Sequence, residues 1–146
     1  MYKNILLPLD GSKRAEAIVA HVENMAMHYN AKVCLLRVDD PPLMLGYDEV
    51  IDEPSYRKQR EQHKKELEMY LASIREKLEE KGIQTRVLIA AGPVVKTILN
   101  IAKEEKIDLI AMASHGIDLS YQRLFGSVAI GLLENTTLPL LLLRNT

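Results

Sequence analysis

The chain has 146 residues, about the length of one domain, and 47% of them are hydrophobic, as in chains that fold around a core. It carries 19 Lys and Arg against 20 Asp and Glu, and a net charge of −1 rules out, as the default interpretation, a broad cationic face for nucleic acid or an anionic membrane, but not a small anion site made of backbone groups. The single cysteine, Cys34, excludes a disulfide framework and a cysteine-rich metal site, and fits a reducing compartment.

Short apolar runs alternate with longer amphipathic segments. In chain order we expect a strand at residues 5–9, a helix at 12–29, a strand at 33–38, a loop at 39–54, a helix at 55–81, a strand at 85–90, a helix at 94–105, a strand at 109–113, a helix at 127–135 and a strand at 138–143. Ser12 is suited to cap the first helix, and Asn30 can end it in the left-handed conformation. Three methionines on helices are expected to fill the core: Met25, Met27 and Met69.

Strands separated by helices predict an α/β fold, with a parallel sheet, right-handed crossovers and helices on both faces. For five strands we expect the open doubly wound order 3-2-1-4-5, which reverses beside the first strand. Ligands of such sheets bind at the carboxyl ends of the strands, where this reversal opens a crevice. The segments that follow the strands are therefore the places to search for chemistry.

The segment after the fourth strand has a glycine near each end. Gly116 can take a positive φ or let the backbone approach a bound group closely. Gly126 and Ser127 open the next helix, whose first N–H groups lack partners within the helix and can bind phosphate together with the Ser127 hydroxyl. The alternative, which this segment alone leaves open, is a turn glycine followed by an ordinary N-cap.

Asp10 and Pro8 lie at the end of the first strand. Asp10 can bond a ribose hydroxyl or help to hold a hydrated Mg²⁺ in the crevice, but Asp also favours turns and helix caps at such places. Pro8 removes a donor from a ladder, so we expect the ladder to be finished there, with the ring on the crevice rim.

Three segments also carry a family resemblance. They are NILLPLDGS at residues 4–12, MASHG at 112–116 followed after nine residues by GSVA at 126–129, and LPLLLLR at 138–144. In this order they resemble the first strand, the ATP-binding loop and the last strand of the universal stress protein family, over essentially the whole chain.

The resemblance implies a Rossmann-like fold of the adenine nucleotide alpha hydrolase type, and binding of ATP, ADP or AMP with or without Mg²⁺. It implies no catalytic residue. For the base, the resemblance implies that Pro8 and Leu9 border the adenine and that the main chain of Val38 meets its edge. For the ribose, it implies that Asp10 lies near the ribose and the metal, and that Met112 and Ala113 lie beside base and ribose. For the phosphates, it implies that they are enclosed by Gly116, Gly126, Ser127 and Val128, while His115 either touches a phosphate or faces solvent.

Ala113 departs from the family pattern, which has its first glycine at this position. ATP binding survives this change if the position needs only a close approach of the backbone. It weakens if the position needs a conformation reserved for glycine.

The last strand, Leu138 to Leu143, is apolar and is expected at the edge of the sheet. An exposed apolar edge promotes association, and pairing with the same strand of a second copy across a two-fold axis would cover it. The family resemblance also implies homodimers of this kind.

Together these patterns predict a single cytoplasmic domain over residues 1–146, with no signal-peptide layout and no apolar run of the ~18 residues that a membrane span needs. The expected function is a homodimeric, nucleotide-binding regulatory or stress-response factor that acts through an unknown protein partner, without nucleic acid and without membrane insertion. Two alternatives stay open. One is a nucleotide-free interaction module of the same fold, and the other is a slow ATPase or autophosphorylating protein, although no Walker-type Gly-Lys-Ser/Thr is present.

Overall fold

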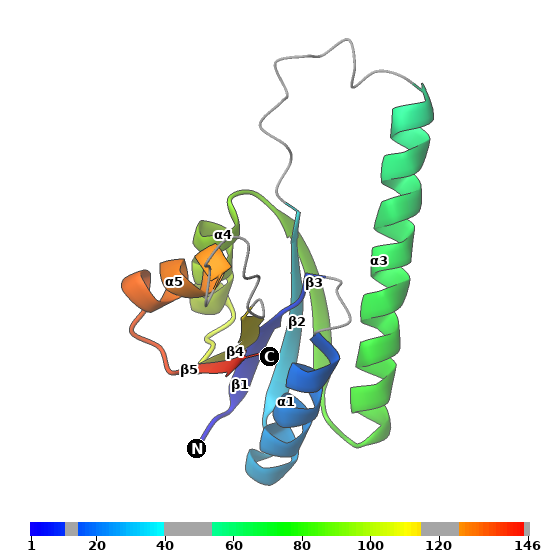
Figure 1. The fold of residues 1–146 in the computed structure, drawn as a ribbon. Coiled ribbons are helices and arrows are strands. Elements are labelled where there is room, and N and C mark those ends of the chain that lie inside the picture. The colour runs from blue at the N-terminus through cyan, green and yellow to red at the C-terminus, as the bar shows by residue number, and fades with distance from the viewer. Residues whose placement is uncertain (11–14, 40–53, 115–125, 145–146) are drawn as a thin grey trace.

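The computed structural model describes residues 1–10, 15–39, 54–114 and 126–144. Its elements are β1 (Asn4–Pro8), α1 (Ala15–Tyr29), β2 (Lys32–Asp39), α3 (Pro54–Glu80), β3 (Thr85–Ala91), α4 (Val94–Glu104), β4 (Leu109–Ser114), α5 (Gly126–Asn135) and β5 (Leu140–Arg144). Strands and helices alternate as the apolar runs predict (Figure 1).

The five strands form one sheet in the order β3-β2-β1-β4-β5, and every neighbouring pair is parallel. The predicted doubly wound order is therefore confirmed. The order reverses beside β1, because the chain first adds β2 and β3 on one side of β1 and then β4 and β5 on the other.

Each face of the sheet has its own core. Side chains alternate between the faces along a strand, so Ile5 and Leu7 of β1 pack with α1 and α3, whereas Leu6 packs with α4 and α5. All three are fully buried. A strand covered on both faces needs apolar residues at every position, which is why β1 and β2 lack the apolar–polar alternation of a half-exposed strand.

The predicted boundaries differ from the observed ones by one or two residues in most elements. The largest shift of a strand is at β5, which begins at Leu140 rather than at Leu138. Pro139 has no N–H to donate, and only its carbonyl joins the sheet, where it accepts the N–H of Ile110 at 3.1 Å. Asn30 follows α1 with a φ of 54°, the left-handed conformation expected there. The proposed cap, Ser12, lies outside the described residues.

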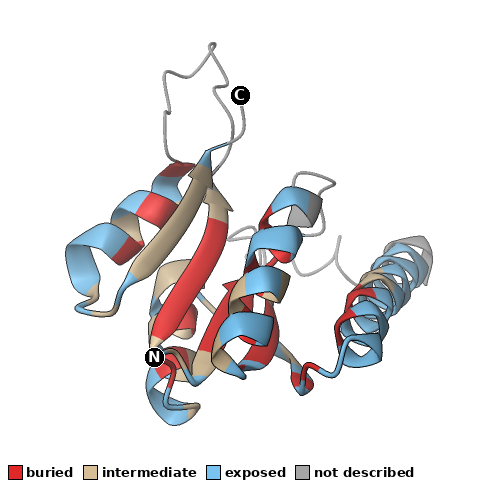
Figure 2. Ribbon diagram, turned by 90° about the horizontal axis from the view of Figure 1, so that it is seen from below, coloured by how far each residue is buried: buried red, intermediate tan, exposed pale blue. Residues whose placement is uncertain are grey.

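The helix α3 is longer than the sheet that it covers. Its 27 residues span about 40 Å, against about 23 Å for the seven residues of β3. Only the second half is anchored, through the buried residues Leu71, Ile74 and Leu78, while every side chain from Arg57 to Glu66 is exposed (Figures 1 and 2).

Two of the three methionines expected to fill the core lie on the outer faces of their helices. Met69 is 72% exposed on α3 and Met27 is 55% exposed on α1, so neither fills the core. Met25 does pack against the core on the α1 side of the sheet. Helical spacing shows which residues share a face of a helix. It does not show how much of the helix length the sheet covers, or how wide the covered face is.

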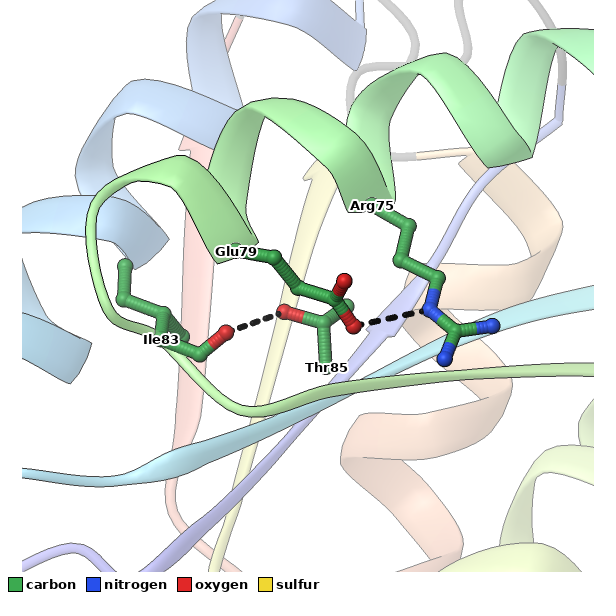
Figure 3. A network of polar contacts seen from close by, with 4 residues as sticks. All are labelled: Arg75, Glu79, Ile83 and Thr85. Carbon is green, nitrogen blue, oxygen red and sulfur yellow. Dashed lines mark hydrogen bonds and ion pairs between the residues drawn. The ribbon is translucent and has the colours of Figure 1, made fainter.

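A tight reversal joins α3 to β3. Gly82 follows the helix with a φ of 81°, a conformation that favours glycine. Thr85 then donates its hydroxyl to the carbonyl of Ile83 at 3.0 Å, which satisfies a buried polar side chain at the start of β3. Arg75 and Glu79 pair one turn apart on the helix at 2.9 Å (Figure 3).

Candidate functional site

At the carboxyl edge of the sheet β1 and β4 part, and the opening between their ends is called the crevice below. Their pairing extends only to Leu6, opposite Ile110. Meanwhile β1 stays paired with β2 as far as Pro8, opposite Leu36, and β4 stays paired with β5 as far as Ser114. The opening therefore lies between the two middle strands, at the point where the strand order reverses, which is the ligand position of open α/β sheets.

Pro8 explains why the two strands part. Leu9 donates its N–H to the carbonyl of Leu36 in β2 at 2.8 Å. Since the N–H groups of successive residues in a strand point to opposite neighbours, the N–H that Pro8 lacks would have pointed to β4. The expectation that the ladder is finished at Pro8 is thus correct toward β4 and wrong toward β2, where pairing continues.

Val38 presents a hydrogen-bond donor and an acceptor beside this opening. Its neighbour Asp39 accepts the N–H of Gly92 on the β3 side at 3.1 Å. By the same alternation, the N–H and C=O of Val38 point the other way, toward the place beyond the end of β1. The side chain of Val38 is buried on the α4 and α5 face, as is that of Met112.

Ala113 lies within β4, opposite Leu143. The non-glycine residues with positive φ in the described part of the chain are Asn30 and Lys106, so Ala113 does not adopt a conformation reserved for glycine. The first of the two possibilities weighed for this departure, a close approach of the backbone, is therefore the one that fits the conformation of Ala113.

The turn into α5 does need a glycine. Gly126 is buried and has a φ of 73°, and it is itself the first residue of the helix. Ser127 therefore lies inside the first turn, with an exposed side chain, rather than before the helix as an N-cap, and Val128 is half-buried. The first N–H groups of α5 face outward at the same edge of the sheet as the crevice.

Sequence reasoning counted residues 90–93, after the third strand, among the places to search but assigned no role to this neighbour of the turn. Ser127 and Val128 line a cavity of about 660 Å³ together with Pro93 and the first turn of α4. The available signal was Gly92-Pro93 directly after a strand, since a glycine and a proline there mark the start of a crossover helix.

The remaining predicted residues are placed less completely. Leu9 is 4% exposed and packs in the α1 and α3 core, so only its main chain can border a ligand. Asp10 is exposed just beyond β1. His115 and Gly116 lie outside the described residues. Within residues 1–10, 15–39, 54–114 and 126–144, no three His, Cys, Asp or Glu side chains gather as a metal site would need.

Cys34 belongs to the core and not to the crevice. It lies in β2, where burial, with a smaller contribution from Glu105, raises the pKa of the thiol from 9.0 to about 11, against the opposing effect of Arg86. A thiol with a raised pKa holds little of the reactive thiolate near neutral pH. Cys34 is therefore a packing residue rather than a reactive thiol.

None of the helices among the described residues combines the length and the apolar character that crossing a bilayer requires.

Known proteins share both this sequence and this fold. The sequence model of the universal stress protein family matches residues 1–144. Universal stress protein MJ0577 of Methanocaldococcus jannaschii is 30% identical over 159 residues, which cover 99% of this chain and 96% of that protein. Its solved structure superimposes with a TM-score of 0.82 at 28% identity, covering 100% of this chain and 98% of the other.

Two more distant structures were solved with nucleotides. A universal stress protein in complex with cAMP has a TM-score of 0.72 at 18% identity, with 99% of this chain and 98% of that chain covered. The universal stress protein of Archaeoglobus fulgidus in complex with dAMP has a TM-score of 0.67 at 15% identity, with coverage of 98% for both chains. At these identities the likeness concerns the fold. The full-length match to the family, together with the relative at 30% identity, settles the relationship: the chain belongs to the universal stress protein family.

Proposed function

We propose that this chain binds an adenine nucleotide, ATP, ADP or AMP, in the crevice between β1 and β4. The observation that carries the proposal is the reversal of the strand order beside β1: Val38 lies at the carboxyl end of β2 on one side of β1, and α5 with Gly126 follows β4 on the other side. Val38 turns a donor and an acceptor toward the crevice, and Gly126 opens a helix whose N–H groups are suited to phosphate.

The adenine would lie against Val38. The Watson–Crick edge of adenine offers one acceptor, N1, and one donor, the N6 amino group. The N–H and the C=O of Val38 form the complementary pair. Pro8, Val38 and Met112 alternate onto the same face of the sheet, so their aliphatic side chains can border the base without an aromatic partner.

The phosphates would lie at the start of α5. Gly126, Ser127 and Val128 supply outward N–H groups and one hydroxyl, which can hold an anion without any net positive charge on the domain. Asp10 would lie near the ribose and help to hold a hydrated Mg²⁺. His115 and Gly116 complete the predicted phosphate loop by their sequence positions.

Relatives support this assignment. Members of the same fold bind cAMP in one structure and dAMP in another, and both ligands contain adenine and a phosphate. Adenine and phosphate are the two groups for which this chain offers complementary contacts.

We further propose that the chain acts as a homodimer through β5. This strand is the last in the sheet, and Leu140 to Leu143 are all partly exposed, as the tan edge strand in Figure 2 shows. On α5, Ile130 is 43% and Leu133 is 53% exposed, because the helix turns Ala129 and Leu132 toward the sheet. Pairing two copies of β5 across a two-fold axis would cover this apolar edge.

In this proposal the protein is a cytoplasmic regulatory factor of the stress response. Bound nucleotide favours one arrangement of the loops around the crevice, and a protein partner recognises that arrangement.

Isothermal titration of the nucleotide-free protein with ATP and Mg²⁺ tests the binding. We expect saturable binding of ATP at submillimolar concentration and weaker binding of GTP, whose base presents its donor and acceptor in the reverse order. Mass spectrometry of protein denatured directly after purification should reveal a co-purified adenine nucleotide. Absence of binding at millimolar ATP would refute the proposal and favour the nucleotide-free interaction module.

A further inference from the structure

The cavity beside Ser127 extends between α4 and α5. It has a volume of about 660 Å³ and is lined by Pro93, Val94, Val95, Lys96, Leu99, Asn100, Ser127, Val128 and Asn135. Among these described lining residues Lys96 carries the one charge, and it is positive. A phosphate group that entered this cavity from Ser127 would meet a cation and no carboxylate.

The cavity joins the proposed phosphate site because α4 and α5 lie against each other. Gly131 makes this possible: a Cβ added there would lie 2.7 Å from Cγ2 of Val95, so a larger residue would force the helices apart. Both helices follow strands of a parallel sheet and therefore begin at its carboxyl edge. Lys96, in the first turn of α4, is thus held near the first turn of α5.

The surroundings of Lys96 favour an anion in two smaller ways. The first turns of α4 and α5 contain no acidic residue. Pro93 precedes α4 without a side-chain hydrogen bond to the helix, so in the described part of the chain no side chain neutralises this helix end.

We infer that Lys96 binds the outer phosphate groups of the nucleotide and makes this chain prefer ATP to AMP. This inference rests on the nucleotide site proposed above. The base is held at Val38 and the first phosphate at Gly126 and Ser127, so a chain of three phosphates reaches into the cavity whereas a single phosphate ends at α5. Lys96 then contributes a charge-assisted contact to ATP that AMP cannot use.

Four proteins test this inference: the wild type, Lys96→Ala, Lys96→Arg and Lys103→Ala. Lys103 is the matched control, a lysine in the last turn of the same helix and outside the cavity lining. The dissociation constants of ATP and AMP are measured for each protein by isothermal titration, and thermal unfolding checks that each variant is folded.

We expect Lys96→Ala to weaken ATP about five- to tenfold and AMP less than twofold, since an exposed charged contact is partly screened by solvent. Lys96→Arg keeps the charge and should keep most of the preference for ATP, while Lys103→Ala should bind as the wild type does. Added salt should reduce the difference between wild type and Lys96→Ala.

Four results would overturn the inference. Equal losses for ATP and AMP in Lys96→Ala would show that Lys96 supports the fold or the base and not the outer phosphates. Unchanged ATP binding in Lys96→Ala, or the same loss in Lys103→Ala, would remove Lys96 from the site while the proposed function stands. A wild type that binds neither nucleotide would refute the proposed function and this inference with it.

Discussion

Replacing Gly126 by alanine tests whether the backbone conformation at this position is needed for stability, for ATP binding or for both. Gly126 has a φ of 73°, in the left-handed region that L residues rarely adopt. Holding alanine there costs about 1–2 kcal/mol, and the smaller freedom of alanine in the unfolded chain returns about 0.4–1 kcal/mol. The expected net loss in the free energy of unfolding is therefore about 1 kcal/mol, or about 4 °C in Tm for a domain of this size.

Gly82 provides the matched control. Its φ is 81°, and a Cβ added to it would meet no atom within 4 Å, so Gly82→Ala carries the same backbone cost without a steric one. Gly82 lies in the turn between α3 and β3, at the edge of the sheet opposite the crevice. Both variants should lose similar free energy of unfolding in urea denaturation. Only Gly126→Ala should lose ATP affinity, by at least about fivefold, because relief of the backbone strain at residue 126 moves the first turn of α5 and its N–H groups.

Two results would refute this reasoning. If Gly126→Ala were as stable as the wild type while Gly82→Ala was not, the left-handed turn before α5 would not be a requirement of the fold. If Gly82→Ala lost as much ATP affinity as Gly126→Ala, the loss would follow from general destabilisation, and the phosphates would have to lie elsewhere.

Two further predictions concern other parts of the molecule. The proposed dimer is expected to appear in light scattering of the wild type, and changing Ile130 and Leu133 together to lysine should yield a folded monomer, because both side chains are exposed. The same change at the exposed Met69 should leave the dimer intact. A monomeric wild type would refute the proposed dimer, and dimers that survive the double substitution would place the interface elsewhere. For Cys34, the raised pKa means that the folded state favours the neutral thiol, so its contribution to the free energy of unfolding is complete below pH 9 and is lost as the pH rises toward 11. Alkylation of Cys34 with iodoacetamide at pH 8 should be slow in the native protein and fast in urea. Equal alkylation rates in the two states would contradict the burial of Cys34.

The fold could be predicted from the sequence because its signals are local and repeated. Each apolar run is bounded by polar turns, and helices between parallel strands leave few topologies for five strands. The boundaries were harder, because Leu9 continues an apolar run one residue past the end of β1, and Leu138 begins one two residues before the start of β5. Hydrophobicity does not distinguish a paired strand residue from a buried one next to it.

The candidate site could be predicted in part. Glycine and serine after a strand indicated the turn at Gly126, and its positive φ agrees with that interpretation. The cavity that Ser127 shares with Lys96 could not be predicted, since it depends on how closely two helices pack at Gly131, and the sequence does not show which residue a helical glycine packs against. Pro8 showed that a ladder ends, but only the three-dimensional pairing tells on which side.

Because only the second half of α3 packs on the sheet, its two halves should unfold locally at different free energies. A helix of about ten residues is barely stable alone in water, so the stretch from Arg57 to Glu66 keeps its form because it extends a helix already nucleated by Leu71, Ile74 and Leu78. Amide hydrogen exchange should therefore grow slower along α3 from its first turns to its last, from local fraying to opening only with the whole domain. A single unbroken helix thus joins a segment that opens easily to one that is protected, and its exposed stretch from Arg57 to Glu66 adds about 15 Å of helix without requiring a larger core.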